Sequence, residues 1–409
     1  MIGTTGKKAT LAALALAALG ATSAWATAYT PGDLVVTRLD DGGAALSNSG
    51  NSIYLDEFTT AAAQAAPVST LTVPNVNGNP DTMVMSPTQS EGELRLSQDG
   101  SQLNFFAYNA YSGQIADIRK AANRTDLIGV VGSQGVLSYA NSTTNAFNPL
   151  DAASHQIRSA YTVDDQNYYV SGDDGGNTPT ASQSGVRYLA SGSSTSTDIS
   201  TAANQARYIT TGPDGNLYAY IKGGTGNYAS AIVNLGVNPT TNNSTPLVLV
   251  KTAAAPYNFN AVDAFSFVTF HTSPGFASGD LLYLSDDGVG ILKYKYDGSA
   301  WQQDGANTVG GNFSLGMTLT SDGTNVTLYM VQGTGGGAVL SMTDAGAESD
   351  TAGAFGALGT TTLATAPTGD QFRGISFAPV ALATTPEPAS IGLLSLGAAG
   401  LLVRRRGAR

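Results

Sequence analysis

The sequence LLYLSDDGVGILKYKY at residues 281–296 contains the unit that decides the fold. Two runs of apolar and aromatic residues, 281–285 and 291–296, flank the tripeptide Asp286-Asp287-Gly288. Runs of this length and composition are typical of β-strands, and glycine suits a tight turn between strands because it tolerates positive φ. Residues 281–296 therefore predict a β-hairpin with an Asp-Gly turn.

The same pattern of strand, Asp-Gly-type turn and aromatic strand recurs along the chain. Copies occur at residues 94–108, 160–171, 207–221 and 317–331, of which 160–171 is the loosest. The units begin near residues 94, 157, 205, 262 and 313. A repeat of roughly 40–60 residues with several strands in each unit is typical of a β-propeller. We therefore predict an all-β fold, with residues 61–66 as the only helix-like run.

The two ends of this region complete the predicted ring. The last strand, residues 372–379, has no hairpin partner after it, and unmatched strands precede the first unit, at residues 34–39, 53–58 and 68–73. Pairing them would complete one blade and leave no free sheet edge. We expect six blades, with the N- and C-terminal strands sharing the closing blade. Seven blades also fit, because residues 140–155 and 345–368 are hard to assign, and a pair of β-sandwiches is the alternative fold.

Composition excludes several kinds of function. The 409 residues include no Cys and two His, so disulfides, thiolate metal sites and a three-His metal site are excluded. The formal net charge of −11 argues against nucleic-acid binding. With 42% hydrophobic residues, the chain can bury a large core.

Residues 1–28 have the three parts of a secretory signal peptide. Lys7 and Lys8 precede the apolar run of residues 9–19, and small residues follow at the overlapping A-x-A sites that end at Ala26 and Ala28. We expect signal peptidase to cleave after Ala26 or Ala28.

The last residues form a second tripartite segment. Pro386-Glu387-Pro388 is followed by an uncharged apolar run at 390–403 and by Arg404, Arg405 and Arg406 within a basic tail at 404–409. As a helix, the apolar run would be about 21 Å long, which is short for a membrane core of about 30 Å. Local thinning and snorkelling of the arginines accommodate a short span, and the arginines place the tail on the cytoplasmic side.

This arrangement resembles the PEP-CTERM sorting signal, which combines a Pro-Glu-Pro motif, a short transmembrane helix and a basic terminus. The resemblance implies recognition and cleavage by an exosortase in the inner membrane of a Gram-negative bacterium, with Pro386, Glu387 and Pro388 as the recognition residues. It also implies an association with extracellular polysaccharide and the cell surface. A permanent C-terminal anchor is the alternative to cleavage.

The region between the two ends has no catalytic signature. No G-x-S-x-G motif occurs, and the acidic pairs, such as Asp164-Asp165 and Asp286-Asp287, lie in turn-like stretches. These pairs leave Ca²⁺ as the only cofactor that the sequence suggests, and turn chemistry explains them equally well. We assign no metal ligand and no catalytic role, including to His155 and His271. Aromatic residues such as Trp301 could stack on sugars or pack between blades.

The sequence therefore predicts five parts: signal peptide 1–28, propeller 29–380, linker 381–389 with the sorting motif, transmembrane helix 390–403 and basic tail 404–409. We expect an exported, non-enzymatic adhesion, binding or scaffold protein of the cell surface or exopolysaccharide matrix. Its expected partners are signal peptidase, an exosortase and extracellular polysaccharide, with the inner membrane only as a transient location. The alternative is an extracellular hydrolase or lyase whose site lies at the propeller channel.

Overall fold

The computed structural model describes most of the region between the two predicted targeting segments. The described residues are 27–40, 42–88, 90–121, 124–147, 155–173, 184–200, 205–223, 230–251, 259, 261–308, 316–332, 337–349, 355 and 358–382. The predicted signal-peptide residues through Ala26, the Pro-Glu-Pro motif, the apolar run and the basic tail lie outside them. No helix among the described residues is long and apolar enough to cross a membrane.

Four separate four-stranded antiparallel sheets are present, and each contains one of the predicted hairpin units or the closing strands. The first has the order β24 (Gln371–Phe377), β1 (Leu34–Asp40), β2 (Ser52–Phe58), β3 (Ser69–Thr72). The second contains β4 (Arg95–Leu96), β5 (Gln102–Tyr108), β6 (Asp126–Gly132) and β7 (Leu137–Thr143). The third contains β16 (Val262–Val268), β17 (Leu281–Asp286), β18 (Gly290–Tyr296) and β19 (Trp301–Asn307). The fourth contains β20 (Met317–Ser321), β21 (Val326–Val331), β22 (Ala338–Asp344) and β23 (Thr361–Thr365).

The remaining eight strands form one sheet, so the predicted count of six separate blades is wrong. The sheet contains β8 (Gln156–Thr162), β9 (Tyr168–Asp173), β10 (Gly185–Leu189), β11 (Thr197–Asp198), β12 (Gln205–Thr211), β13 (Leu217–Gly223), β14 (Ala231–Gly236) and β15 (Leu247–Lys251). Its two halves are joined where β12 pairs with β9 at Gln205 and Asp173. The structure therefore shows four separate blades, because this backbone pairing merges two of the predicted units.

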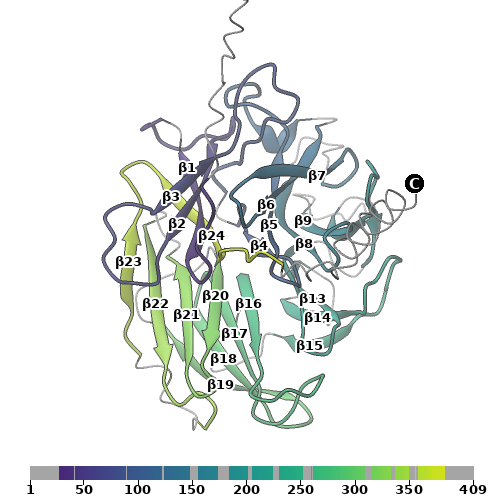
Figure 1. Ribbon diagram of the computed structural model, residues 1–409. Coiled ribbons are helices and arrows are strands. Elements are labelled where there is room, and N and C mark those ends of the chain that lie inside the picture. Colours follow the sequence, from purple (N-terminus) through teal and green to yellow (C-terminus); the bar gives the residue numbers. More distant parts are fainter. Residues whose placement is uncertain are drawn as a thin grey trace, which may run out of the picture.

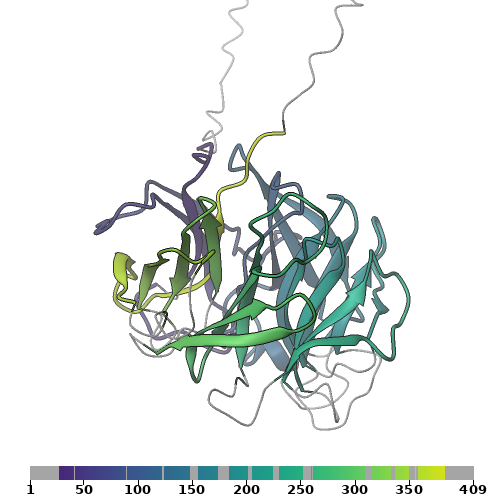
Figure 2. The same ribbon diagram turned by 90° about the horizontal axis from the view of Figure 1, so that it is seen from below.

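The sheets are arranged around a common centre, as in a propeller (Figure 1). One strand of each unit contacts the corresponding strand of the next unit, in the order β24, β4, β8, β12, β16, β20 and back to β24. These six strands, which we call the inner strands, therefore form a closed ring. The closing blade is confirmed, because β1 pairs with both β24 and β2. Figure 2 shows the purple and yellow ends of the described chain leaving the same side of the domain.

The hairpin turns form where the sequence predicts them. Gly100 and Gly215 have φ of +76° and +75°, a region that side chains with a Cβ seldom adopt. Aspartate side chains stabilise these turns, since Oδ1 of Asp286 accepts from the backbone N–H of Gly288 at 2.9 Å. The acidic pair Asp164-Asp165 is also in a turn, where Oδ1 of Asp164 accepts from Asn167 N–H at 2.7 Å. Turn chemistry therefore accounts for the first aspartate of each pair.

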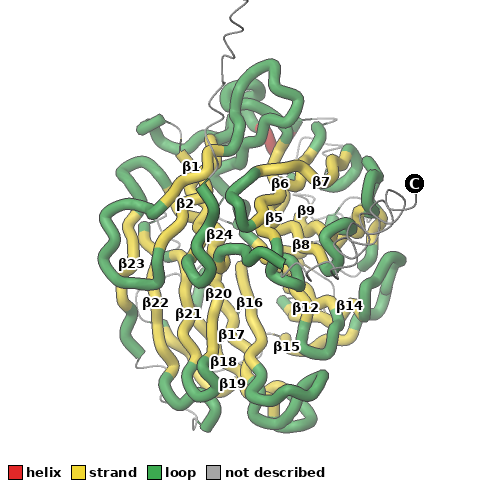
Figure 3. The backbone as a smooth tube through the Cα atoms, in the orientation of Figure 1, coloured by secondary structure: helices red, strands yellow, loops and turns green. Residues whose placement is uncertain are grey.

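Little of the described chain is helical (Figure 3). The only helix in these residues is the 3-10 turn η1 (Ile118–Lys120), with Asp117 as its N-cap. The expectation of a helix at residues 61–66 is wrong, because Gln64 instead forms an isolated parallel bridge with Ala364.

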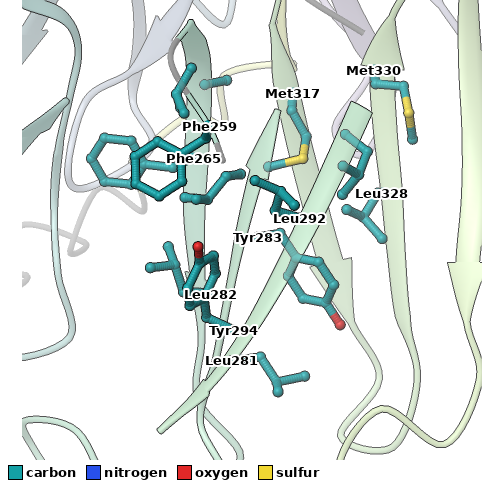
Figure 4. Close-up of a cluster of buried hydrophobic side chains, with 14 of the residues drawn as sticks. Phe259, Phe265, Leu281, Leu282, Tyr283, Leu292, Tyr294, Met317, Leu328 and Met330 are labelled. Atoms are coloured by element: carbon teal, nitrogen blue, oxygen red, sulfur yellow. The ribbon is translucent and has the colours of Figure 1, made fainter. Parts of the chain in front are cut away.

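Apolar side chains fill the space between neighbouring sheets. The largest cluster contains Phe265, Tyr283, Leu292 and Met317, all of them at most 1% exposed (Figure 4). A second cluster packs Phe58 against Phe372, whose ring centroids are 5.8 Å apart at 82°. Alternation along each strand supplies these contacts, because successive side chains point to opposite faces of a sheet. The core therefore holds the ring of inner strands in place.

Candidate functional site

A charged pocket lies at one end of the ring of inner strands. It borders the first residues of β8, β12 and β16 and has a volume of about 370 Å³. Three basic and three acidic residues line it together with four uncharged polar residues: Arg158, Arg207, Lys222, Asp173, Asp263, Asp287, Thr88, Ser90, Gln156 and Gln205. We call this the charged pocket. The described lining residues are all polar or charged, which favours a ligand held by hydrogen bonds and ion pairs.

A short repeated motif positions the arginines of this region. The inner strands β8, β12 and β24 begin Gln-Ile-Arg, Gln-Ala-Arg and Gln-Phe-Arg, and residues 93–95 read Glu-Leu-Arg. The first and third residues of such a triplet point to the same face of a strand. The fold therefore brings together four arginines from distant parts of the chain, which we call the arginine collar: Arg95, Arg158, Arg207 and Arg373.

Two collar arginines form ion pairs within the pocket. Nη2 of Arg158 donates to Oδ2 of Asp173 at 2.5 Å, and Nη1 of Arg207 donates to Oδ1 of Asp263 at 2.5 Å. The glutamine of the motif also takes part, because Oε1 of Gln156 accepts from Arg158. Among the described residues, nothing accepts a hydrogen bond from Nε and Nη1 of Arg158 or from Nε of Arg207. Each guanidinium therefore keeps unused N–H donors although its residue is more than nine-tenths buried.

The other two collar arginines are held by aromatic and carbonyl groups and are not among the described lining residues of the pocket. Arg95 lies over the ring of Tyr208, at 3.9 Å from its centroid. Arg373 donates from Nη2 to the carbonyl of Pro87 at 2.9 Å and to the side chain of Gln371. Burial lowers the pKa of Arg95 and of Arg373 to about 10, so both remain cationic at neutral pH.

The collar surrounds a buried glutamate. Glu93 is 2% exposed, and the described residues give its carboxylate no hydrogen bond. Burial and then the charge of Asp263 raise its pKa well above the usual value, against the opposing charges of Arg95, Arg207 and Arg158. Burial therefore favours the neutral, protonated form of Glu93 more strongly than that of the other acids in this region.

Close backbone packing fixes the segment that carries Glu93. The N–H of Gly374 in β24 donates to the carbonyl of Gly92 at 3.0 Å. A Cβ at position 374 would lie 2.3 Å from the nitrogen of Leu94, so only glycine allows this approach. Closure of the ring by β24 therefore also positions the glutamate within the collar.

The carboxyl groups and the lysine of the pocket respond to burial in the expected directions. Burial raises the pKa of Asp263 to about 6, although the charge of Arg207 opposes this shift. Burial and the neighbouring arginines lower the pKa of Lys222. Between pH 5 and 7, protonation of Asp263 would therefore make the pocket more positive.

A second pocket, of about 550 Å³, lies at the opposite ends of β12 and β16. Its lining includes Thr210, Thr211, Ser266 and Phe267 and contains no ionisable side chain. The two pockets therefore differ in chemistry, because the described lining of the charged pocket includes buried cations and anions and that of the second pocket includes neither.

The two histidines lie apart from this site. His155 is 2% exposed and directly precedes β8, without lining the charged pocket. His271 lies in the connection between β16 and β17, where its Nε2 is 2.9 Å from Oδ2 of Asp280. Neither histidine is brought to the charged pocket.

The aromatic residues considered as sugar platforms are largely packed into the domain. Tyr168, Tyr169, Tyr218 and Tyr220 are at most 2% exposed, which supports packing between strands. Trp301 lies against Phe276 and Tyr296, with ring centroids 5.2 and 5.3 Å away.

The arginine collar is not among the candidate residues of the sequence analysis, which assigns no metal ligand and no catalytic role. The recurrent Gln-x-Arg at the start of inner strands was the available signal. Among the described residues, no group of three or more His, Asp or Glu side chains could hold a metal ion.

Fold and site together define a propeller-type protein with a charged pocket at one end of its inner strands. The chain also carries a PEP-CTERM protein-sorting motif at residues 384–406. The prediction of an exosortase substrate is confirmed, and the motif implies export and membrane-anchored sorting before display at the cell surface.

Comparison with solved structures finds remote similarities, and comparison with curated proteins finds no match. A proposed 6-phosphogluconolactonase from Bacteroides fragilis is 16% identical, with a TM-score of 0.41 over 81% of this chain and 82% of that one. The β-propeller domain of the Trilobed protease from Pyrococcus furiosus is 10% identical, with a TM-score of 0.33 over 82% and 94%. Oligogalacturonate lyase from Vibrio parahaemolyticus is 9% identical, with a TM-score of 0.29 over 74% and 89%.

Proposed function

We propose that this exported protein is a non-enzymatic binding protein of the cell surface or exopolysaccharide matrix, and that the charged pocket is its ligand site. The observation that carries the proposal is a pocket lined wholly by polar residues at one end of the propeller ring. Sugar hydroxyls both donate and accept hydrogen bonds, so they match a lining that offers guanidinium donors and carboxylate acceptors together. Extracellular polysaccharide is therefore the proposed partner.

We further propose that export follows the two terminal segments. Signal peptidase would cleave after Ala26 or Ala28, and residues 390–403 would cross the inner membrane until an exosortase acts at Pro386-Glu387-Pro388. Mass spectrometry of the exported protein tests both steps, because it reports the first and last residues of the mature chain. A mature form that begins upstream of Ala26 or retains residues 404–409 would contradict this pathway.

One incubation experiment can distinguish a binding protein from an enzyme that cleaves the polysaccharide. The full chain, purified in mild detergent, is mixed with exopolysaccharide from the producing cells, and both cosedimentation and the size of the polysaccharide are measured. We expect saturable cosedimentation with unchanged chain length. Shortening of the polysaccharide would replace this proposal with the hydrolase or lyase alternative, and the absence of both effects would refute polysaccharide as the partner.

A further inference from the structure

We propose that the charged pocket binds the carboxylate of a hydroxy acid of monosaccharide size, such as a uronate, through Arg158 and Arg207. The inference rests on the proposed ligand-binding role of the pocket and adds the chemical class of the ligand. Two features support it. Some N–H donors of these arginines have no acceptor, and the pocket has the size and the polar lining that suit a small acid.

The buried side-chain atoms without a partner in the described pocket residues are all hydrogen-bond donors. They are Nε and Nη1 of Arg158 and Nε of Arg207, while no carboxylate oxygen of the described pocket residues is both buried and without a partner. A buried polar atom without a partner is costly, so the group that complements this site must be an acceptor. A carboxylate fits best, because guanidinium groups bind its two oxygens side by side.

The acids around the pocket permit an anion to enter. Asp173 and Asp263 already accept from Arg158 and Arg207, so these pairs leave the remaining N–H groups of the arginines for a ligand. The third acid of the lining, Asp287, faces Asp263 and adds to the negative charge there, against the charges of Arg207 and Arg158. Glu93 is faced by Arg95 from β4, Arg158 from β8, Arg207 from β12 and Asp263 from β16, and burial disfavours its charged form. An anion between the arginines would add negative potential near Glu93 and Asp263, so ligand binding should be linked to proton uptake.

The rest of the lining suits hydroxyl groups. Gln156, Gln205, Thr88 and Ser90 supply amide and hydroxyl groups, each able to donate and to accept. The volume of about 370 Å³ lies near the lower end of the range for small-molecule pockets, about 300–1,000 Å³. One sugar-sized acid is therefore a better match than an extended apolar ligand.

Calorimetric titration of the full chain in mild detergent tests this assignment with three matched probes: glucuronate, its methyl ester and glucose. We expect glucuronate to bind at least tenfold more tightly than either neutral probe, and more tightly at pH 5.5 than at pH 7.5. Proton uptake is measured by repeating the titration in buffers of different ionisation enthalpy. Equal affinity for glucuronate and its methyl ester would overturn the proposal.

Variants locate the site. Arg158→Gln should weaken glucuronate binding at least tenfold, whereas Arg158→Lys, which keeps the charge at Asp173, should weaken it less. Lys251→Gln is the control, since Lys251 is an exposed residue of β15 and does not line the pocket. Circular dichroism establishes that each variant is folded, and if Arg158→Gln is not, Arg207→Lys provides the same comparison. Unchanged glucuronate affinity in the folded arginine variants would refute the assignment.

The outcomes distinguish this inference from the proposed function. If polysaccharide cosediments but glucuronate has no advantage over its ester, the carboxylate assignment fails and the binding role stands. If neither polysaccharide nor any monosaccharide binds, both fail.

Discussion

Replacing Gly374 with alanine tests how the ring of inner strands is closed. Gly374 lies in β24, and an added Cβ would be 2.3 Å from the nitrogen of Leu94 and 2.4 Å from the oxygen of Gly92. Cβ atoms essentially never approach closer than 3.0 Å, so these backbone segments must separate by at least 0.7 Å. No flexible side chain can move aside instead, so the change should cost the upper end of the usual overpacking range, about 3 kcal/mol.

Part of this cost is offset in the unfolded chain. Replacing glycine with alanine reduces unfolded-state entropy and contributes about 0.4–1 kcal/mol of stability, so the net loss should be about 2–3 kcal/mol. Gly132→Ala is the matched control, because nothing lies within 4 Å of a Cβ at that strand position. It should leave stability unchanged or raise it slightly.

Urea denaturation followed by circular dichroism measures both variants. We expect the urea concentration at the midpoint of unfolding to be lower for Gly374→Ala than for the parent protein. The midpoint of Gly132→Ala should not be lower. If Gly374→Ala unfolds within 0.5 kcal/mol of the parent protein, residues 92–94 do not pack against β24 in solution. The ring closure described above would then be incorrect at its tightest point.

Three further predictions address sorting, closure of the ring and pH. Glu387→Gln should leave an unprocessed, membrane-held form; fractionation and immunoblotting measure this, and normal processing would contradict the role of Glu387. Phe372→Ala should cost about 3–5 kcal/mol, because Phe372 is 1% exposed and packs on Phe58; an unchanged urea midpoint would refute closure by β24. Burial raises the pKa of Asp126 and of Asp263 to about 6, so the folded state binds protons between about pH 6 and 4 that the unfolded state does not. Stability should therefore rise as pH falls from 7 to 5, and Asp263→Asn should reduce this slope; a midpoint that falls over the same range would contradict the assignment.

The sequence predicts the local parts of the fold well. Asp-Gly turns and apolar runs specify hairpins such as β17–β18, because the information lies within about fifteen consecutive residues. The closing blade is also predictable, since an unmatched strand at one end requires a partner. The number of separate sheets was not predictable, because the link between β9 and β12 is one backbone pairing at Asp173 and Gln205. Backbone groups can form such a pairing whatever their side chains are.

Only part of the candidate site could be predicted from the sequence. The Gln-x-Arg motif can be read in the sequence once inner strands are known, but the contacts of its arginines cannot. Arg207 pairs with Asp263, which is 56 residues away on another strand, and the packing of Gly374 on Gly92 depends on ring closure. Sorting information, in contrast, is carried by consecutive residues, so the tail could be assigned from the sequence alone.

The distribution of charge is the strongest argument that the arginine collar contributes to ligand binding as well as to the stability of the fold. Six of the 19 basic residues and one of the 30 acidic residues belong to the two targeting segments, so the exported domain has 13 basic and 29 acidic residues, a formal charge of −16. Five of those 13 basic residues, the collar and Lys222, gather around one end of the ring, where the described acids near them include Glu91, Glu93, Asp173, Asp263 and Asp287. A domain that repels anions over most of its surface thus concentrates its cations where a pocket is present. Such an arrangement opposes non-specific binding of acidic polymers while it favours one anionic group at one place. Burying arginines is costly unless their N–H groups have partners, and a ligand carboxylate would supply an acceptor for the groups of Arg158 and Arg207 that have none among the described residues.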